Sequence, residues 1–277
     1  MLRLIALAAL LGAAVTPSHA GLVTFSASGV NAADIQATVD SFRTSLGSLN
    51  PNVAGSFGTG RREINWDGVP DALSAPNILP ANFFNVNSPR GVVYSTLGTG
   101  FQVSASAASG TPVEFGNINA SYPGLFETFS AQRLFTALGS NVVDVNFFVP
   151  GTTTPAFTTG FGAVFSDIDL ANTTSIQFFD LANVSLGTVF APSITGNETL
   201  SFVGGLFNAG EHVGHVRITS GNAALGPNES LPTADLVVMD DFIYAEPRAI
   251  AAVPEPASLS LFLLGVLLIW SWGRRSE

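Results

Sequence analysis

Two groups of closely spaced aspartates are the residues whose type and spacing most directly suggest chemistry. Asp167 and Asp169 lie two positions apart after an apolar run, and Asp240 and Asp241 are adjacent within another. Positions i and i+2 of an extended chain face the same side, so one cation can reach both carboxylates of the first pair. Calcium prefers such oxygen ligands. We therefore predict a structural calcium ion held by Asp167 and Asp169, with Asp240 or Asp241 as further ligands. Solvated acids at strand ends are the alternative.

Trp66 is the candidate residue for contact with a sugar. It ends an alternating stretch that begins at Arg61, and it is followed by Asp67 and Gly68. An indole at a strand end offers a flat apolar face with one polar edge, which suits a sugar ring. The alternative is that Trp66 is a buried core residue. The first interpretation makes the chain a candidate glycan-binding module.

Catalytic patterns are weak in this sequence. His212 and His215 lie in a β-branched stretch that predicts a strand, where positions three apart face opposite ways and cannot share a zinc ion. The chain has no cysteine, and no G-x-S-x-G nucleophile motif is present. Several acids are available for glycoside cleavage, but no spacing singles out a pair. These acids are Glu63, Asp67, Asp71, Glu114 and Glu127. We therefore expect no enzyme, and a secreted hydrolase is the least favoured alternative.

Composition limits the partners of the chain. It has 277 residues, a net charge of −10 at pH 7 and only 11% charged residues, and every basic residue other than histidine is an arginine. Such a chain is repelled by phosphate backbones, which argues against binding to nucleic acid. An acidic, sparsely charged surface suits calcium or a neutral polymer such as an exopolysaccharide. The 28 glycines and 22 phenylalanines indicate many turns and a Phe-rich core.

The elements that must position these residues are mostly short strands. Apolar and polar residues alternate in 142–149, and similar runs recur at 161–165, 174–179, 184–190, 200–207, 213–219 and 236–244. Turn residues separate them. Short strands at this spacing, without long helices between them, predict a mainly β protein: an antiparallel β-sandwich of jelly-roll type.

One short helix is predicted near the beginning of the chain. Asn31 is a favourable N-cap, Asp34 lies in the first turn, and Gly47 can end the helix. Between them, Ile35, Val39, Phe42 and Leu46 fall on one stripe. We therefore expect an amphipathic helix over 32–46 that packs on a sheet.

Residues 1–20 have the three parts of a secretory signal peptide. Arg3 supplies the positive start, an apolar stretch follows over 4–15, and the small residues Ser18 and Ala20 precede the expected cleavage site. Signal peptidase is therefore an expected partner, and the mature chain is expected to begin at Gly21.

The C-terminal end carries a second hydrophobic segment. An apolar run over 257–272 is followed by Arg274 and Arg275. As a helix the run is about 24 Å long, somewhat shorter than the hydrocarbon core of a bilayer. Trp270 and Trp272 suit the membrane interface, and the arginine pair places the tail in the cytoplasm. We therefore predict a C-terminal transmembrane helix in the inner membrane.

This tail also resembles a known sorting signal. Pro254, Glu255 and Pro256, followed by a short apolar segment and terminal arginines, resemble the PEP-CTERM signal of Gram-negative bacteria. The resemblance covers only residues 254–277. It implies that an exosortase in the inner membrane recognises the three residues and processes the tail. It also implies release or attachment outside the cell, commonly in species that make exopolysaccharide and biofilm. It implies no activity.

Together these features predict four segments and one function. The segments are a signal peptide (1–20), a β-sandwich domain (21–247), a linker (248–253) and the sorting signal with its transmembrane helix (254–277). The expected function is that of a non-enzymatic cell-surface or extracellular-matrix protein, first anchored in the inner membrane and then exported. A glycan-binding module of the extracellular polymer is the main alternative.

Overall fold

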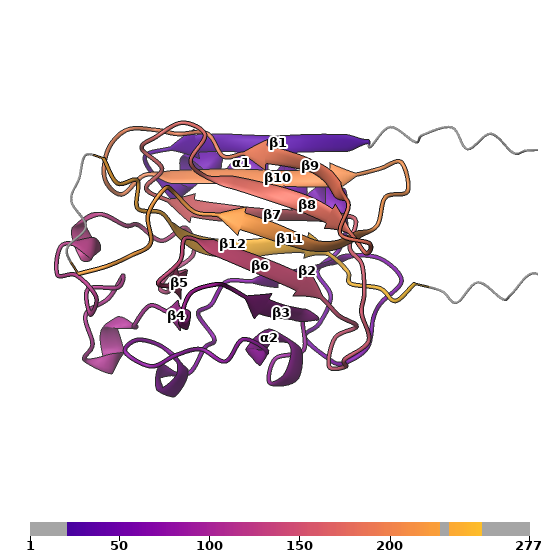
Figure 1. Cartoon of the computed structure of the whole chain (residues 1–277), viewed down its shortest axis with the longest axis horizontal. Coiled ribbons are helices and arrows are strands. Elements are labelled where there is room, and N and C mark those ends of the chain that lie inside the picture. Colours follow the sequence, from indigo (N-terminus) through magenta and orange to yellow (C-terminus); the bar gives the residue numbers. More distant parts are fainter. Residues whose placement is uncertain (1–20, 228–232, 251–277) are drawn as a thin grey trace, which may run out of the picture.

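The structure is a computed structural model that describes residues 21–227 and 233–250. The predicted signal peptide, the second half of the linker (251–253) and the sorting signal, including Pro254, Glu255 and Pro256, lie outside the described residues. Within them the chain is mainly β, with two antiparallel sheets and few helices, as predicted (Figure 1). None of the helices in this part is long and apolar enough to span a membrane.

The larger sheet has seven strands, in the order β1-β10-β7-β12-β5-β4, with β2 also paired to β12. Every pairing in it is antiparallel. The bounds are β1 Leu22–Gly29, β2 Arg61–Ile64, β4 Gly100–Val103, β5 Phe135–Leu138, β7 Gly160–Ser166, β10 Leu200–Phe207 and β12 Val238–Ala245. The central strands β7 and β12 are buried along their whole length, because both faces of the sheet are covered there.

The smaller sheet has five strands, in the order β3-β6-β11-β8-β9. The bounds are β3 Val92–Ser95, β6 Val142–Phe147, β8 Ser175–Asp180, β9 Ser185–Phe190 and β11 Val213–Thr219. In β6 and β8, buried and partly exposed residues alternate. This pattern is that of a sheet with one face on the core and the other toward solvent. The strand predictions from β6 to β12 are confirmed.

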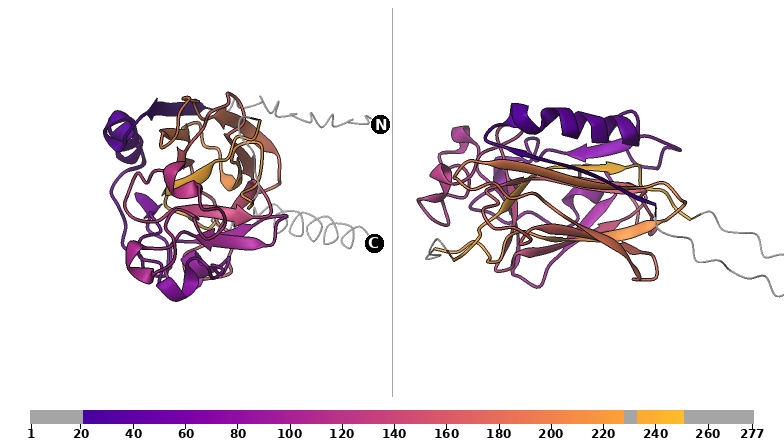
Figure 2. Two further views of the ribbon diagram at one scale, coloured as in Figure 1. Left: turned by 90° about the vertical axis from the view of Figure 1, so that its left-hand side faces the viewer. Right: turned by 90° about the horizontal axis from the view of Figure 1, so that it is seen from above.

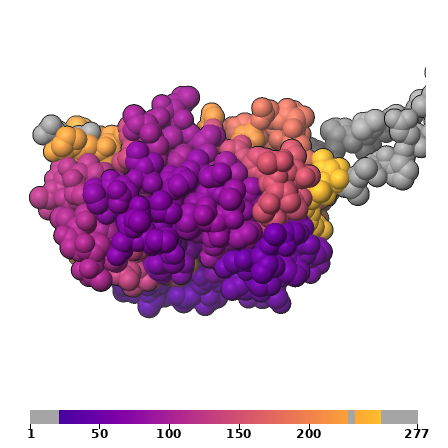
Figure 3. Space-filling view, turned by 90° about the horizontal axis from the view of Figure 1, so that it is seen from below, coloured from indigo at the N-terminus to yellow at the C-terminus, as the bar shows by residue number. Residues whose placement is uncertain are grey.

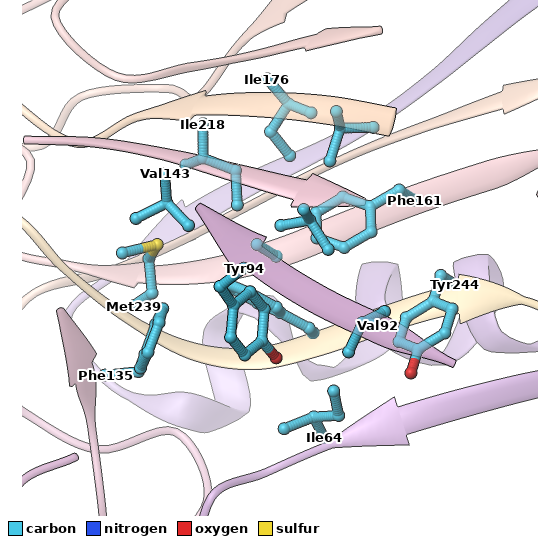
Figure 4. Packing of buried hydrophobic residues seen from close by; sticks show 14 of the residues in the cluster. Ile64, Val92, Tyr94, Phe135, Val143, Phe161, Ile176, Ile218, Met239 and Tyr244 are labelled. Atoms are coloured by element: carbon cyan, nitrogen blue, oxygen red, sulfur yellow. The ribbon is translucent and has the colours of Figure 1, made fainter. Parts of the chain in front are cut away.

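The main core lies between the two sheets. Val143, Ile176 and Ile218 come from the smaller sheet, and Phe161 and Met239 come from the larger one. Figure 4 shows these side chains filling one shared interior. Trp66, Tyr94 and several phenylalanines add ring contacts between 4.1 and 6.3 Å. The two sheets therefore pack face to face, as in a β-sandwich.

Helix α1 (Ala32–Leu46) covers the outer face of the larger sheet. Its stripe of Ile35, Val39, Phe42 and Leu46 is buried against Val164, Leu200, Phe202 and Ile243. Asn31 and Asp34 form a capping box at its start. Figure 2 (right) shows the helix lying along one side of the sheets. The predicted bounds and the predicted packing are both confirmed.

Long connections between β2 and β5 close one side of the molecule (Figure 3). They contain helix α2 (Phe83–Val86) and the 3-10 turns Asp71–Leu73, Ala107–Ser109 and Tyr122–Gly124. A third cluster of buried residues, including Phe115, Tyr122 and Leu134, packs beneath them.

The two ends of the described chain lie at the same end of the sheets. Leu22 pairs with Phe207, and Tyr244 pairs with Phe161, so Gly21 and the end of β12 both lie where β7 begins. Figure 1 shows both on its right-hand side. The end of β7, with Asp167, lies at the opposite end, which we call the distal end.

Candidate functional site

Asp240 and Asp241 lie in the middle of β12, at an irregularity in its pairing with β7. Asp240 accepts hydrogen bonds from the backbone N–H groups of Phe129 (2.6 Å) and Ser130 (3.1 Å). Asp241 accepts one from the Ser130 hydroxyl (2.7 Å) and forms an ion pair with Arg43 (3.0 Å). Burial, and then the neighbouring Asp241, raise the pKa of Asp240 well above its usual range. The pair is thus satisfied by the protein itself.

Asp167 directly follows β7 and is 2% exposed. Its φ of 70° lies in the left-handed region, and its Oδ1 atom has no hydrogen-bond partner among the described residues. Burial, together with the charges of Asp169 and Asp235, raises its pKa to about 8. The Oδ atoms of Asp169 and Asp235 accept backbone hydrogen bonds from Gly196 N and Asp169 N, respectively, each at 2.9 Å. Burial and the two neighbouring carboxylates therefore favour the neutral form of Asp167.

The four aspartates considered as calcium ligands fall into two separate groups, and calcium binding by Asp167 and Asp169 stays a prediction. Asp240 and Asp241 contact Ser130 and Arg43, whereas the carboxylates that act on Asp167 are Asp169 and Asp235. The guanidinium of Arg43 already forms an ion pair with Asp241. Across residues 21–227 and 233–250, no group of three or more histidine or acidic side chains is arranged to hold a metal ion.

Three glutamates extend the acidic character of the distal end. Burial, and then the charges of Glu127 and Glu198, raise the pKa of Glu114 to about 7. The backbone N–H of Glu127 donates to the Ser166 hydroxyl at the end of β7, and Glu198 precedes Thr199, whose carbonyl accepts from Asp167 N. The six distal acids, none of which forms an ion pair with arginine in the described part of the chain, are Glu114, Glu127, Asp167, Asp169, Glu198 and Asp235.

Trp66 is not at the surface, so its predicted role in contacting a sugar is corrected. It is 1% exposed, and one face of its indole stacks on Phe135 with ring centroids 4.1 Å apart. Its Nε1 donates to the carbonyl of Asp240 at 2.8 Å. The polar edge of the indole is therefore hydrogen-bonded to the backbone, and its rings pack against aromatic residues of the core.

The outer face of the smaller sheet carries polar and aromatic side chains that contact one another across the strands. No helix of the described chain lies on it (Figure 2, right). His215 pairs across the strands with Asn146 and Phe179, and Arg217 pairs with Asp144 and Gln177. The outward-facing set, all partly or fully exposed, is Val93, Ser95, Val142, Asp144, Asn146, Ser175, Gln177, Phe179, Thr188, Phe190, His215, Arg217 and Thr219.

The side chains at the centre of this face hold one another in place. The His215 ring lies parallel to the Phe179 ring, with centroids 4.5 Å apart. Arg217 binds Asp144 through two hydrogen bonds, of 2.7 and 2.9 Å. Burial lowers the pKa of His215, and the charge of Asp144 offsets only part of this lowering. The imidazole is therefore neutral at pH 7. The result is a flat surface with stacked rings, a neutralised ion pair and amide groups.

Two hollows lie beside this face, on either side of the turn between β8 and β9. One, of about 150 Å³, is lined by residues that include Asn146, Asp180 and His215. The other, of about 330 Å³, is lined by residues that include Asp180, Glu211 and His212. The ring of His212 stacks on Phe157 at 3.6 Å. The two histidines therefore line different hollows.

Comparison with protein families, with curated proteins and with solved structures finds no match for this chain.

Proposed function

We propose that this chain is an exported cell-surface or extracellular-matrix protein, sorted by an exosortase and without enzymatic activity. The signals at its two ends motivate this function. The observation that carries it furthest is that Gly21 and the end of β12 lie at the same end of the sheets. A domain held at its C-terminal end by a membrane anchor then points its acidic distal end away from the anionic membrane surface, as electrostatics favours.

The order in which the chain visits the two sheets indicates the type of β-sandwich. From β6 to β12 the chain crosses repeatedly between the two sheets, since β6, β8, β9 and β11 belong to the smaller sheet and β7, β10 and β12 to the larger. Such alternation is typical of a jelly roll, which we propose as the topology. A transmembrane helix over 257–272 completes the proposed architecture.

Replacing Pro254, Glu255 and Pro256 together with alanine is expected to leave the protein in the inner membrane, because the exosortase no longer recognises the tail. Fractionation of cells that produce an exosortase measures this. The matched control changes Ala251, Ala252 and Val253 to serine, which leaves the tripeptide intact and should leave export unchanged. Equal export of both variants would contradict the sorting function.

Binding of a neutral glycan is the second candidate function, and the outer face of the smaller sheet favours it. Sugar hydroxyls pair with amide, carboxylate and guanidinium groups, while a sugar ring stacks on an aromatic ring. Gln177, Asn146 and the Arg217–Asp144 pair supply the polar groups, and the His215–Phe179 stack supplies the rings. The ion pair carries no net charge, so this face suits a neutral chain better than a polyanion.

Gln177→Ala and His215→Ala are each expected to weaken glycan binding about five- to thirtyfold, since each removes a central contact worth about 1–2 kcal/mol. Binding to an array of neutral glycans measures this. Gln36→Ala is the matched control, because Gln36 is partly exposed on α1, on the other side of the molecule. If the parent protein binds a glycan and neither substitution weakens that binding, the glycan binds elsewhere on the molecule.

A further inference from the structure

Gly21, the first described residue, is held by a carboxylate from a distant part of the chain. Its backbone nitrogen donates to Glu211 Oε1 at 2.6 Å, and its carbonyl accepts from Asn208 N at 3.2 Å. The other oxygen of Glu211 accepts from the backbone N–H of Ala209 at 3.0 Å. Residue 21 therefore continues the pairing of β1 with β10 by one step, with its nitrogen directed at Glu211.

Glycine fits this position closely. A Cβ atom added at Gly21 would clash with Asn208 Oδ1 and would lie 3.0 Å from Ala209 Cβ and 3.2 Å from Ala209 N. The Asn208 side chain can rotate away, but a side chain at position 21 would still crowd Ala209. Glycine therefore allows the least crowded approach of this strand end to the 208–211 turn.

The chemistry of the Gly21 nitrogen depends on processing. While residue 20 is attached, the nitrogen is an amide with one hydrogen and no charge. Cleavage between Ala20 and Gly21 converts it to an α-ammonium group, with a typical pKa of about 7.7–8.0. Hydrogen bonds between ions are shorter and stronger than those of a neutral amide. Although partial burial opposes ionisation, hydrogen bonds from Gly21 and Ala209 lower the pKa of Glu211, so the carboxylate is charged before cleavage.

We propose that Glu211 is the binding site for the α-ammonium group that signal peptidase releases at Gly21. Removal of the signal peptide then adds an ion pair that fastens β1 to β10 at the edge of the larger sheet. The cleavage position rests on the proposed function; the ability of Glu211 to bind the ammonium group does not. The mature N-terminus is thereby bound to the sheet edge through Glu211.

The test compares chains of residues 21–277 in mild detergent that differ only at the N-terminus. One begins with free Gly21, released from a fusion by a protease that leaves no residue behind. The second has Gly21 acetylated, and the third keeps Ala20. We expect the free form to melt about 2–4 °C above the acetylated and extended forms. In Glu211→Gln this difference should vanish, whereas in Glu198→Gln, a matched change at the distal end, it should persist.

Equal melting temperatures for the free and acetylated forms would overturn the site at Glu211, as would a difference that survives Glu211→Gln. Neither result bears on export. N-terminal sequencing of the exported protein tests the cleavage position separately. A first residue other than Gly21 would overturn the link to signal peptidase even if the melting difference were present.

Discussion

Replacing Arg62 with methionine is expected to lower the free energy of unfolding by about 3–5 kcal/mol, because it leaves the partner of a buried ion pair without a counter-charge. Arg62 and Glu246 are 0% and 1% exposed and are joined by two hydrogen bonds, of 2.7 and 2.9 Å. The same guanidinium donates to the carbonyls of Pro51 (2.6 Å) and Pro89 (3.0 Å). It thus connects β2, the end of β12 and two loops.

Urea unfolding of residues 21–250 measures this loss. Arg62→Lys should also destabilise, because a lysine cannot reproduce the forked contact. Removing both charges, in Arg62→Met with Glu246→Leu, should restore part of the stability. Arg217→Met is the matched control: Arg217 also binds its partner through two hydrogen bonds but is 48% exposed, so its loss should cost about 1 kcal/mol or less. An equal loss in Arg62→Met and Arg217→Met would contradict the structural role of the buried pair.

Asp167→Asn is expected to stabilise the protein at pH 8 by about 3–5 kcal/mol. In the unfolded chain an aspartate ionises near pH 4, whereas burial and two neighbouring acids raise the pKa of Asp167 to about 8 in the folded protein. Between these values the folded state holds a proton that the unfolded state has released. The stability of the parent therefore falls as the pH rises from about 4 to about 8.

The amide removes this titration without disturbing the backbone, because asparagine also adopts the positive φ of 70° found at this position. The Asp167→Asn variant should thus show a much flatter stability profile over this pH range. Asp180→Asn is the control, since Asp180 is partly exposed and accepts backbone hydrogen bonds from Ala182 and Val184. If millimolar calcium raised the melting temperature of the parent at pH 8 but not that of Asp167→Asn, Asp167 would be a cation ligand rather than a protonated acid.

The parts of the fold that the sequence predicts well are those with a clean local pattern. Helix α1 has the predicted bounds because a capping residue, an apolar stripe and a terminal glycine all agree. The strands from β6 to β12 follow from alternation or from long apolar runs. Strands β3, β4 and β5 have four residues each, too few for a period to emerge, and they lie among irregular connections.

The site was less predictable, because its contacts join residues far apart in the sequence. Spacing correctly marks Asp240 and Asp241 as unusual, but it cannot reveal that Arg43 pairs with Asp241 or that the Ser130 hydroxyl binds both carboxylates. The sequence around Trp66 is compatible with either a buried or an exposed side chain. Its stacking on Phe135, which is distant in the sequence, shows that it is buried. Gly21 and Glu211 are 190 positions apart. The alternation that predicts β6, β8 and β11 could have revealed the polar outer face.

The central claim is that the chain is exported and sorted through its two ends. The intact mass of the protein recovered outside the cells tests this most directly. We predict a mass for a chain that begins at Gly21 and has lost the segment that follows Pro256. An extracellular form that still contained Trp270 to Glu277 would contradict the claim.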